Sequence, residues 1–411
     1  MPSPETASKT KPRLLIILNR FVIGGQAVDT IPLAYYLQQH FEIQILFGEK
    51  EKDEIEPRFL LDKYKGLSLR KLRFLRRSIN PLIDIIAFIS LVAAIRKFRP
   101  DIVHTHGAKS GFLGRFAAFV LRAPVIIHTF HGHFFHSYFS RFVSRFIAFV
   151  ERSIGLITTC TVALSETQKQ ELVNDFKIIP FRKVKIIPLG FDIVEASDSL
   201  YQRAIFRDKY QLQSKHIAVG IVGRIVPVKN HIMFLKVIKK LQKSYAHIPF
   251  CFFIIGDGGL KVELENWLQQ NDISFNSEGV NANNSIVFTS WITNVEEIMC
   301  GLDIVALTSF NEGTPLTLIE SQFYKRPVVC TNVGGVKDTM IDQKTGFLLN
   351  VDEIEEFALK LVSLAENEDL RRKMGETGKE FVISHFNKLN EVAITKQFYL
   401  DLLSQNSNKH K

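Results

Sequence analysis

The stretch Ile217–Lys243, IAVGIVGRIVPVKNHIMFLKVIKKLQK, decides the fold of this chain. Its first six residues, Ile217–Val222, are apolar or glycine and mostly β-branched, which is the pattern of a strand buried on both faces. A glycine turn at Gly223 follows, and apolar residues then recur at helical spacing from His231. A buried strand that runs through a glycine turn into a helix is typical of a parallel βαβ unit. The stretch therefore predicts a doubly wound α/β domain.

The same alternation of short apolar runs and helical segments extends in both directions. Upstream, strands are predicted at Arg13–Leu18, Glu42–Phe47, Asp101–His104, Pro124–His128, Leu156–Thr159 and Val184–Ile187, and helices at Gly25–Gln39, Pro81–Lys97, Ser110–Leu121, Ser140–Ile154 and Ser165–Asn174. Downstream, strands are predicted at Phe250–Ile255, Ser285–Phe288, Ile304–Leu307 and Pro327–Cys330, and a helix at Asn387–Leu403. The pattern predicts two tandem Rossmann-like domains, each with a doubly wound parallel sheet, which face a central cleft.

The predicted domain organisation has four parts. Residues 1–11 are a polar, disordered tail without the apolar core of a signal peptide, and residues 12–192 are an N-terminal Rossmann-like domain. Residues 193–385 are a C-terminal Rossmann-like domain, and residues 386–411 are a helix, expected to pack back towards the N-terminal domain, with a polar tail. Because open α/β sheets bind ligands at the carboxyl ends of their strands, functional residues are expected on the loops that follow strands.

Composition narrows the class of protein. The chain is 46% hydrophobic and 23% charged, which is typical of a folded soluble protein. The longest apolar run, Leu82–Ile95, is interrupted by Asp84 and is shorter than the about 20 residues that a membrane-spanning helix needs. Widely separated cysteines are expected to be core residues in a reducing, cytoplasmic compartment; they are Cys160, Cys251, Cys300 and Cys330. The net charge of +10 favours nucleic acid, an anionic membrane surface or a phosphate-bearing substrate.

Two loops of the second domain carry candidate binding residues. Arg224 and Lys229 stand on either side of a helix N-terminus that Asn230 is expected to cap, and free amides, the helix dipole and two cations together can bind phosphate. Two solvated basic residues in a strand-to-helix loop are the alternative.

The segment Phe310–Glu320, FNEGTPLTLIE, follows a predicted strand. Thr314 is expected to cap a helix that starts at Pro315 and ends before Pro327. Glu312 and Glu320 then flank this helix start, where their carboxylates can accept hydrogen bonds from sugar hydroxyls. A dipole-stabilising acid and an ordinary helix-surface residue are the respective alternatives.

These residues resemble a known family. Glu312 and Glu320, with seven residues between them, resemble the E-x7-E signature of the retaining glycosyltransferases of family 4, which have the two-domain GT-B fold. Gly223-Arg224 with Lys229 resembles the diphosphate-binding pair of that family. The segments Gly256–Gly259, Asn332–Gly335 and Thr345–Leu348 resemble its recurring turns.

The resemblance implies a role for each residue. Glu312 would hold hydroxyls of the donor sugar, Glu320 the nucleotide ribose, and Arg224 and Lys229 the leaving diphosphate, while the base would rest near Trp291. The implied catalytic residues are His131, Glu312, Arg224 and Lys229. The implied donor-binding residues are Gly25, Gly223, Arg224, Lys229, Trp291, Ile292, Glu312, Gly313, Thr314, Pro315, Leu316 and Glu320. No Asp-x-Asp motif is present, so no metal and no cofactor are expected.

The first domain carries the histidine-rich stretch His128–His136. His131 follows a predicted strand and resembles the donor-site histidine of the family, with His133 as the alternative. A metal site is the less favoured interpretation, because no carboxylate or cysteine cluster accompanies these histidines. His104 and His106 can also line the cleft. Gly24-Gly25 resembles the N-terminal glycine turn of the family, although Gln26 follows where the family often has charged residues.

The expected function is that of a metal-independent retaining glycosyltransferase. The resemblance implies that it moves a hexose-type sugar from a nucleotide-diphosphate sugar, with a UDP-sugar favoured, to a glycan or lipid-linked glycan acceptor in surface polysaccharide or lipopolysaccharide synthesis. The alternatives are a nucleotide-sugar epimerase of the same fold, a non-catalytic glycan-binding relative and a nucleic-acid-binding protein, for which no recognition motif is found.

Two segments of the first domain combine basic and apolar residues. One is Arg70–Arg77, RKLRFLRR, and the other is the helix that carries Arg141, Arg145 and Arg152 next to Phe142, Phe146 and Phe149. Such a surface can lie on anionic lipid at the inner face of a membrane. Solvated basic residues over a packed core are the alternative.

Overall fold

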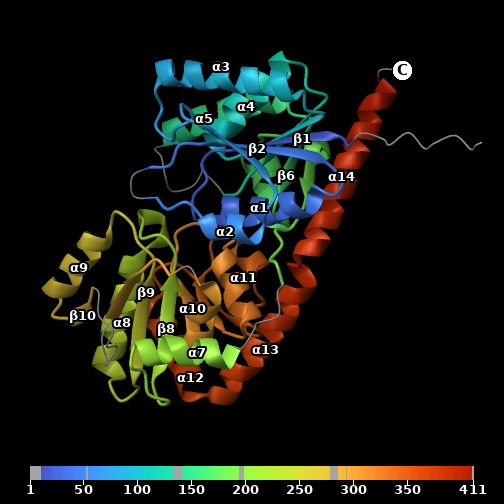
Figure 1. Cartoon of the computed structure of the whole chain (residues 1–411). Helices are drawn as coiled ribbons and strands as arrows, with labels where there is room; N and C mark the ends of the chain where they lie inside the picture. Colours follow the sequence, from blue (N-terminus) through green and yellow to red (C-terminus); the bar gives the residue numbers. More distant parts are fainter. Residues whose placement is uncertain are drawn as a thin grey trace, which may run out of the picture.

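The computed structural model describes residues 11–51, 54–132, 141–193, 199–277, 286–292 and 294–409. Within these ranges the chain forms two α/β domains stacked one on the other, and the C-terminal helix runs alongside both (Figure 1). The predicted tail at residues 1–11 lies outside the described residues except for Lys11.

The first domain is built on a sheet of seven described strands, all paired in parallel in the order β3-β2-β1-β4-β5-β6-β7. The strands are β1 (Arg13–Leu18), β2 (Glu42–Gly48), β3 (Ser68–Leu72), β4 (Ile102–His106), β5 (Val125–Thr129), β6 (Cys160–Ala163) and β7 (Val184–Ile186). The helices are α1 (Gly25–Leu37), α2 (Arg58–Lys63), α3 (Pro81–Phe98), α4 (Ala108–Val120), α5 (Arg141–Leu156), α6 (Glu166–Gln170), η1 (Glu171–Asp175) and η2 (Phe181–Lys183). The strand order reverses between β1 and β4, so their carboxyl ends form a crevice.

The second domain repeats this plan in the order β10-β11-β9-β8-β12-β13-β14, again all parallel among the described strands. Its strands are β8 (Ile217–Val222), β9 (Phe250–Ile255), β10 (Phe275–Asn276), β11 (Ile286–Ser290), β12 (Ile304–Leu307), β13 (Val328–Thr331) and β14 (Gly346–Leu349). Its helices are α7 (Ser199–Lys209), η3 (Pro227–Lys229), α8 (His231–Ser244), α9 (Lys261–Gln270), α10 (Val295–Gly301), α11 (Leu316–Phe323), η4 (Gly334–Asp338), α12 (Ile354–Glu366) and α13 (Glu368–His385). The C-terminal helix α14 (Lys388–Lys409) follows this domain. The crevice of this sheet lies between β8 and β12.

The predicted fold of two doubly wound parallel sheets is confirmed, but one strand was misplaced. The run Leu156–Thr159 is not a strand, because Leu156 ends α5 and the Thr158 hydroxyl caps the carbonyl of Ile154 at 2.8 Å. The strand in this part of the chain is β6, which begins at Cys160.

Some elements were missed in the sequence. The edge strand β3 pairs only with β2 among the described strands and carries the charged residues Arg70 and Lys71, and charged side chains commonly protect a sheet edge from further pairing. Other missed elements are the strand β10 and the helices α2, α7, α9, α10, α12 and α13. Gly346–Leu349, expected as part of a turn, forms β14.

The core consists of apolar side chains on both faces of each sheet, and all four cysteines are buried, as expected. None of the described helices is long and apolar enough to cross a membrane.

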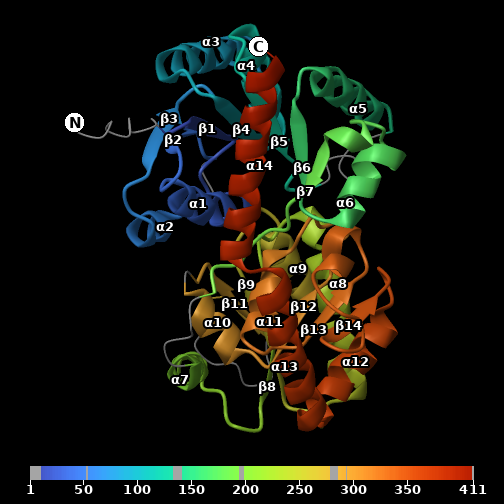
Figure 2. The ribbon, with the colours of Figure 1, turned by 90° about the vertical axis from the view of Figure 1, so that its right-hand side faces the viewer.

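The helix α14 runs alongside the first domain (Figure 2), and buried polar contacts fasten it there. The ammonium of Lys388 lies 2.7 Å from the Asp29 carboxylate on α1 and 2.6 Å from the Glu391 carboxylate, and all three side chains are buried. Burial opposes the charge on Lys388, but the two carboxylates outweigh burial and raise its pKa. Glu391 also accepts a hydrogen bond from the amide of Gly190, in the segment that connects the domains, at 2.8 Å.

We expect Lys388→Met to lower the free energy of unfolding by about 3–5 kcal/mol, because it leaves the buried Asp29 carboxylate without its counter-charge. Urea unfolding monitored by circular dichroism measures this. The control is Lys240→Met, because Lys240 forms an exposed pair with Glu355 and its loss should cost less than about 1 kcal/mol. Equal losses in the two variants would contradict a structural role for the buried cluster.

Candidate functional site

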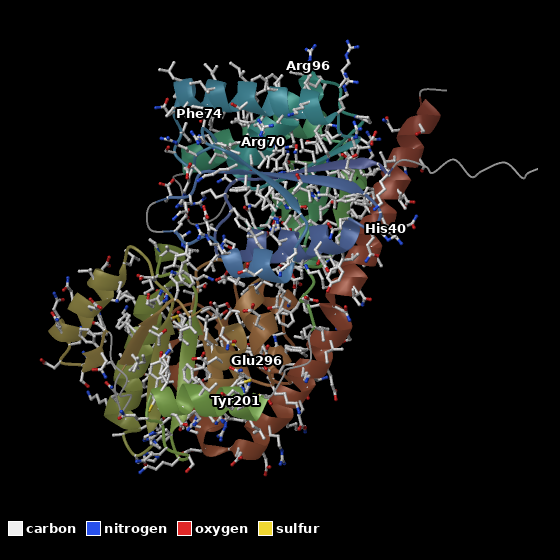
Figure 3. The ribbon with its side chains drawn as sticks, viewed as in Figure 1. His40, Arg70, Phe74, Arg96, Tyr201 and Glu296 are labelled. Atoms are coloured by element: carbon white, nitrogen blue, oxygen red, sulfur yellow. The ribbon has the colours of Figure 1, made fainter. Side chains whose placement is uncertain are left out.

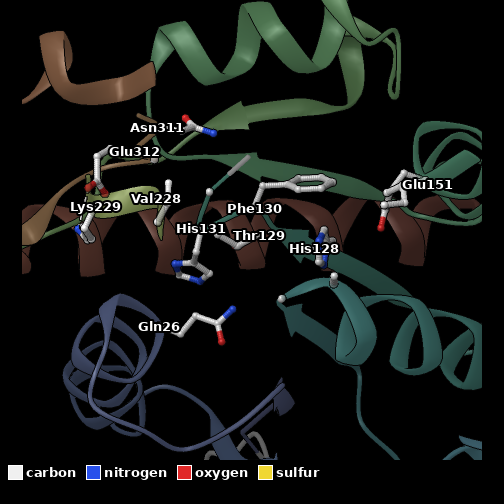
Figure 4. A pocket seen from close by; sticks show the side chains of 15 residues that line it. Gln26, His128, Thr129, Phe130, His131, Glu151, Val228, Lys229, Asn311 and Glu312 are labelled. Atoms are coloured by element: carbon white, nitrogen blue, oxygen red, sulfur yellow. Dashed lines mark hydrogen bonds and ion pairs between the residues drawn. The ribbon is translucent and has the colours of Figure 1, made fainter. Parts of the chain in front are cut away.

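A cavity of about 310 Å³ lies between the domains at the carboxyl ends of their central strands (Figure 4). The first domain contributes residues that follow β1, β4 and β5 together with residues of α5, and the second domain contributes the loops after β8 and β12. The described lining residues are Gln26, Gly107, Ala108, His128, Thr129, Phe130, His131, Gly132, Ile147, Glu151, Val228, Lys229, Asn311, Glu312 and Gly313.

The loop after β8 places Lys229 in this cavity. Asn230 takes the left-handed conformation that asparagine tolerates, and its side chain accepts a hydrogen bond from the amide of Met233, which confirms it as the cap of α8. The segment Gly256–Gly259 packs closely against this loop. A side chain on Gly256 would collide with the carbonyl of Gly223. Gly256 also has a positive φ of 135°, which favours glycine.

The loop after β12 is bonded directly to the loop after β8. The amide of Phe310 donates to the carbonyl of Val228 at 2.8 Å, and the hydroxyl of Thr308 donates to the carbonyl of Lys229 at 3.2 Å. This pairing brings the Lys229 ammonium to 2.7 Å from the Glu312 carboxylate, and Figure 4 shows the two side chains facing each other at one end of the cavity. This half-buried, charge-assisted hydrogen bond orients both side chains.

The glycine turn at Asn332–Gly335 explains how Glu312 is held. The amide of Gly335 donates to the carbonyl of Glu312 at 3.0 Å, and a side chain on Gly335 would collide with the carbonyl of Gly313. The two loops thus pack backbone against backbone, which only glycine permits.

The predicted start of α11 was wrong by one residue. Thr314 makes no capping bond, and Pro315, expected at the first helical position, has an extended ψ of 102° and occupies the cap position, so the helix begins at Leu316. The helix ends at Phe323, and Lys325 follows in a left-handed conformation, so the helix stops before Pro327 restricts it. Gly25 of α1 approaches this helix start, since a side chain there would meet Leu316.

Glu320 stands apart from Glu312. It lies on the second turn of α11, outside the described lining of the cavity, and burial raises the pKa of its carboxyl group to about 7. Its carboxyl group is therefore close to half-protonated near neutral pH.

Arg224 does not line the cavity that contains Lys229 but a separate, smaller crevice. Its guanidinium lies 3.3 Å from the carboxylate of Glu54, a residue of the first domain that is paired with Arg20 as well. Trp291 lines the same small crevice as Arg224 and Glu54, whereas Ile292 packs against the core of the second domain. The two cations predicted to share one anion therefore have separate partners in this structure.

His131 lines the cavity, directly after β5. Its Nε2 atom lies 2.7 Å from Nδ1 of His106, whose ring stacks on His104 at 4.3 Å between centroids. His104 in turn is hydrogen-bonded to Tyr399 of α14 at 2.5 Å. Burial lowers the pKa of all three imidazoles, to about 3 for His104, so they are neutral at physiological pH. His133 lies outside the described residues.

Several lining residues were missed in the sequence. Glu151 of α5 reaches the cavity while paired with the buried Arg115 at 2.7 Å, and no local pattern around it signals a site. Gly107 was detectable in principle, since it directly follows the strand that ends at His106. The described residues contain no group of three or more histidine, cysteine or acidic side chains that could hold a metal ion.

Comparison with known proteins assigns both halves of the chain. Residues 23–195 match the model of "Glycosyltransferase Family 4", and residues 202–381 match that of "Glycosyl transferases group 1".

Among curated proteins, the chain is 27% identical to the UDP-Gal:alpha-D-GlcNAc-diphosphoundecaprenol alpha-1,3-galactosyltransferase of Escherichia coli, over 80% of this chain and 82% of that one. It is 24% identical to the capsular polysaccharide biosynthesis glycosyltransferase CapM of Staphylococcus aureus, over 76% and 80%. Among solved structures, Anabaena Alr3699/HepE in complex with UDP and glucose has a TM-score of 0.79 at 15% identity, with 95% of this chain and 100% of that chain covered.

The neutral histidine cluster makes stability depend on pH. In the unfolded chain these imidazoles take up protons below about pH 6.5, whereas in the folded chain burial keeps them neutral. Stability is thus fully present above about pH 6.5 and is lost as the pH falls, by about 1.4 kcal/mol per pH unit for each such histidine.

We therefore expect the urea midpoint to drop between pH 7.5 and pH 5.5, and His104→Gln to make this drop smaller. His247→Gln is the control, because His247 is exposed and should leave the slope unchanged. An unchanged slope in His104→Gln would contradict the neutral state of this imidazole.

Proposed function

Because this chain belongs to glycosyltransferase family 4, with the GT-B fold, we propose that it is a retaining hexosyltransferase that uses a nucleotide-diphosphate sugar, with a UDP-sugar favoured. The proposed acceptor is a lipid-linked glycan in the synthesis of a surface polysaccharide. The names of the relatives support this choice: one acts on a diphosphoundecaprenol-linked sugar, and another belongs to capsular polysaccharide biosynthesis. We assign the acceptor to residues 12–192 and the nucleotide sugar to residues 193–385.

The observation that carries the proposal is the Lys229–Glu312 pair, which faces His131 across the cavity between the domains. A cation can bind the phosphate end of a sugar phosphate, and a carboxylate and a neutral imidazole can form hydrogen bonds with its sugar end. Lys229 would attract the diphosphate, while the Glu312 carboxylate would accept hydrogen bonds from sugar hydroxyls. The backbone amides at the start of α11 would add to the anion site.

In the proposed mechanism the acceptor hydroxyl attacks on the face that the diphosphate leaves. Lys229, Arg224 and the amides of Gly313–Leu316 stabilise the charge that develops on the leaving group, so catalysis consists of positioning and electrostatic stabilisation. The departing phosphate accepts the proton of the acceptor hydroxyl. We propose that no divalent metal is needed, because these cations take its place.

We expect Glu312→Ala to lower turnover by about 100-fold or more with nucleotide binding retained, because it removes a contact to the reacting sugar. Glu320→Ala should mainly weaken nucleotide binding, by about tenfold, through the loss of a ribose hydrogen bond. The assay measures nucleotide release from UDP-, GDP- and ADP-sugars with an undecaprenyl-diphosphate-linked sugar as acceptor, and titration calorimetry measures nucleotide binding.

Glu355→Ala, on the exposed surface of α12, is the matched control. Nuclear magnetic resonance of the product tests retention, and an excess of EDTA should leave the rate unchanged. A product formed without acceptor would indicate an epimerase, and loss of activity in EDTA with rescue by manganese would rule out the metal-free mechanism.

We also propose that the first domain docks on an anionic membrane. Its helices α3, α4 and α5 lie at the end of the molecule away from the second domain (Figure 1) and expose large apolar side chains. Ile79 is 89% exposed and Leu82 is 75% exposed. The other exposed apolar residues of this α3–α5 face are Ile85, Ile86, Ile89, Phe112, Phe116, Phe119, Val120, Phe146 and Phe149.

Basic residues accompany this face. Arg73, Arg76 and Arg77 are exposed beside the start of α3, and Arg96 is exposed near its end, while Figure 3 shows Arg70, Phe74 and Arg96 on this domain. Arg152 is partly engaged, because it donates to the carbonyl of Phe176 at 2.7 Å. Arginines around exposed apolar side chains match the headgroup and acyl layers of an anionic bilayer.

We expect the protein to float with vesicles that contain phosphatidylglycerol, and the double variant Ile79→Asp and Leu82→Asp to abolish this flotation. The control is Val262→Asp, which changes a comparably exposed apolar residue, 65% accessible, on α9 of the second domain. Absence of flotation of the wild type at low salt would remove the membrane proposal and would leave the assignment of the donor site intact.

A further inference from the structure

Arg224 of the second domain forms an ion pair with Glu54 of the first domain. Glu54, in the loop after β2, places Oε1 between two guanidinium groups: that of Arg20, after β1, and that of Arg224, after β8, at 3.3 Å. The Glu54 side chain is 3% exposed, so it is almost completely removed from solvent. A cation that the proposed function assigns to the donor is therefore already paired with a carboxylate from the other domain.

The first domain holds Glu54 more firmly than Arg224 does. Besides the pair with Arg20, the Oε2 atom of Glu54 accepts a hydrogen bond from the amide of Glu51 at 3.0 Å, and its carbonyl accepts one from Lys50 at 2.8 Å. The Arg224 side chain, in contrast, is 30% exposed, compared with 14% for Arg20. If the cluster opens, Glu54 therefore stays with the first domain, and Arg224 is the group that leaves.

The cluster also has more positive than negative groups. Burial lowers the pKa of Arg20, and the nearby cations Arg77 and Arg224 lower it further while Glu54 opposes them. Two guanidinium groups, those of Arg20 and Arg224, therefore share one carboxylate, and a third cation, Arg77, lies close enough to act on Arg20. An anion that binds Arg224 has to replace the attraction that Glu54 supplies, which makes Glu54 and a phosphate group alternatives for the same guanidinium.

We propose that Glu54 is an internal competitor of the donor diphosphate for Arg224, so that it sets the affinity for the donor and for the nucleotide product. The inference rests on the proposed function, because it takes Arg224 as a ligand of the diphosphate. When the nucleotide sugar binds, Arg224 moves from Glu54 to the diphosphate. After transfer, Glu54 takes Arg224 back and so favours release of the nucleoside diphosphate.

The test is the affinity of the full-length protein for UDP, with GDP and ADP alongside, measured by titration calorimetry. We expect Glu54→Gln to bind the nucleotide about threefold to tenfold more tightly than the wild type, as for loss of one competing, partly buried ion pair. In steady-state assays the same variant should have a lower KM for the donor and stronger inhibition by the nucleoside diphosphate. Glu49→Gln is the matched control, because Glu49 follows the same strand and pairs with Lys71 of the first domain instead.

A double-mutant cycle separates direct competition from a general change in charge. In an Arg224→Gln background, Glu54→Gln should no longer raise the affinity, whereas a long-range field effect would raise it in both backgrounds. Glu54→Asp, which keeps the charge but shortens the side chain, serves as the second variant if Glu54→Gln lowers the thermal midpoint.

The outcomes distinguish the two proposals. If Arg224→Gln binds nucleotide as tightly as the wild type, the role of Arg224 in the proposed function is wrong. If Arg224→Gln weakens binding while the Glu54 variants bind no more tightly than the wild type, the donor site stands and the competition by Glu54 is refuted.

Discussion

The arrangement of the two domains depends on the buried ion pairs of the Lys388 ammonium with Asp29 and Glu391. Lys388 joins α14 to α1 through Asp29, and its partner Glu391 binds the amide of Gly190 in the connecting segment. Because a lone buried charge is costly, these groups favour one geometry in which Lys388 stays in contact with Asp29 and Glu391. The connection between the domains is thereby fixed at the same place where the last helix crosses back to the first domain.

This fixed connection explains how two separately folded sheets share one cavity. Each sheet presents the crevice at its strand-order reversal, and the loops that line the cavity come from both crevices. The approach is close: a side chain on Gly313 would lie 2.5 Å from the carbonyl oxygen of His131. The absence of a side chain at Gly313 therefore sets how near the second domain can come to the first.

The sequence was most informative where strands are buried on both faces. The runs Arg13–Leu18, Ile217–Val222 and Phe250–Ile255 were predicted with their observed bounds, because nothing but a central parallel strand suits such runs. The prediction of secondary structure failed where the local sequence pattern favours one structure and the pairing or packing in the folded chain imposes another. The charged edge strand β3 lacks an apolar run, and Leu156 belongs to α5 although the residues that follow it, Ile157–Thr159, are β-branched.

The same distinction applies to the site. Lys229, Glu312 and His131 could be found because they follow strands of an α/β sheet, and loops after strands meet in one cleft. Glu54 could not be found, because its partners are distant in sequence and its loop carries no motif. Yet Glu54 and Glu312 form ion pairs with Arg224 and Lys229, the two cations that we assign to the diphosphate. Each cation is thus compensated by a carboxylate from within the protein, so the proposed binding of a diphosphate has to exchange these ion pairs.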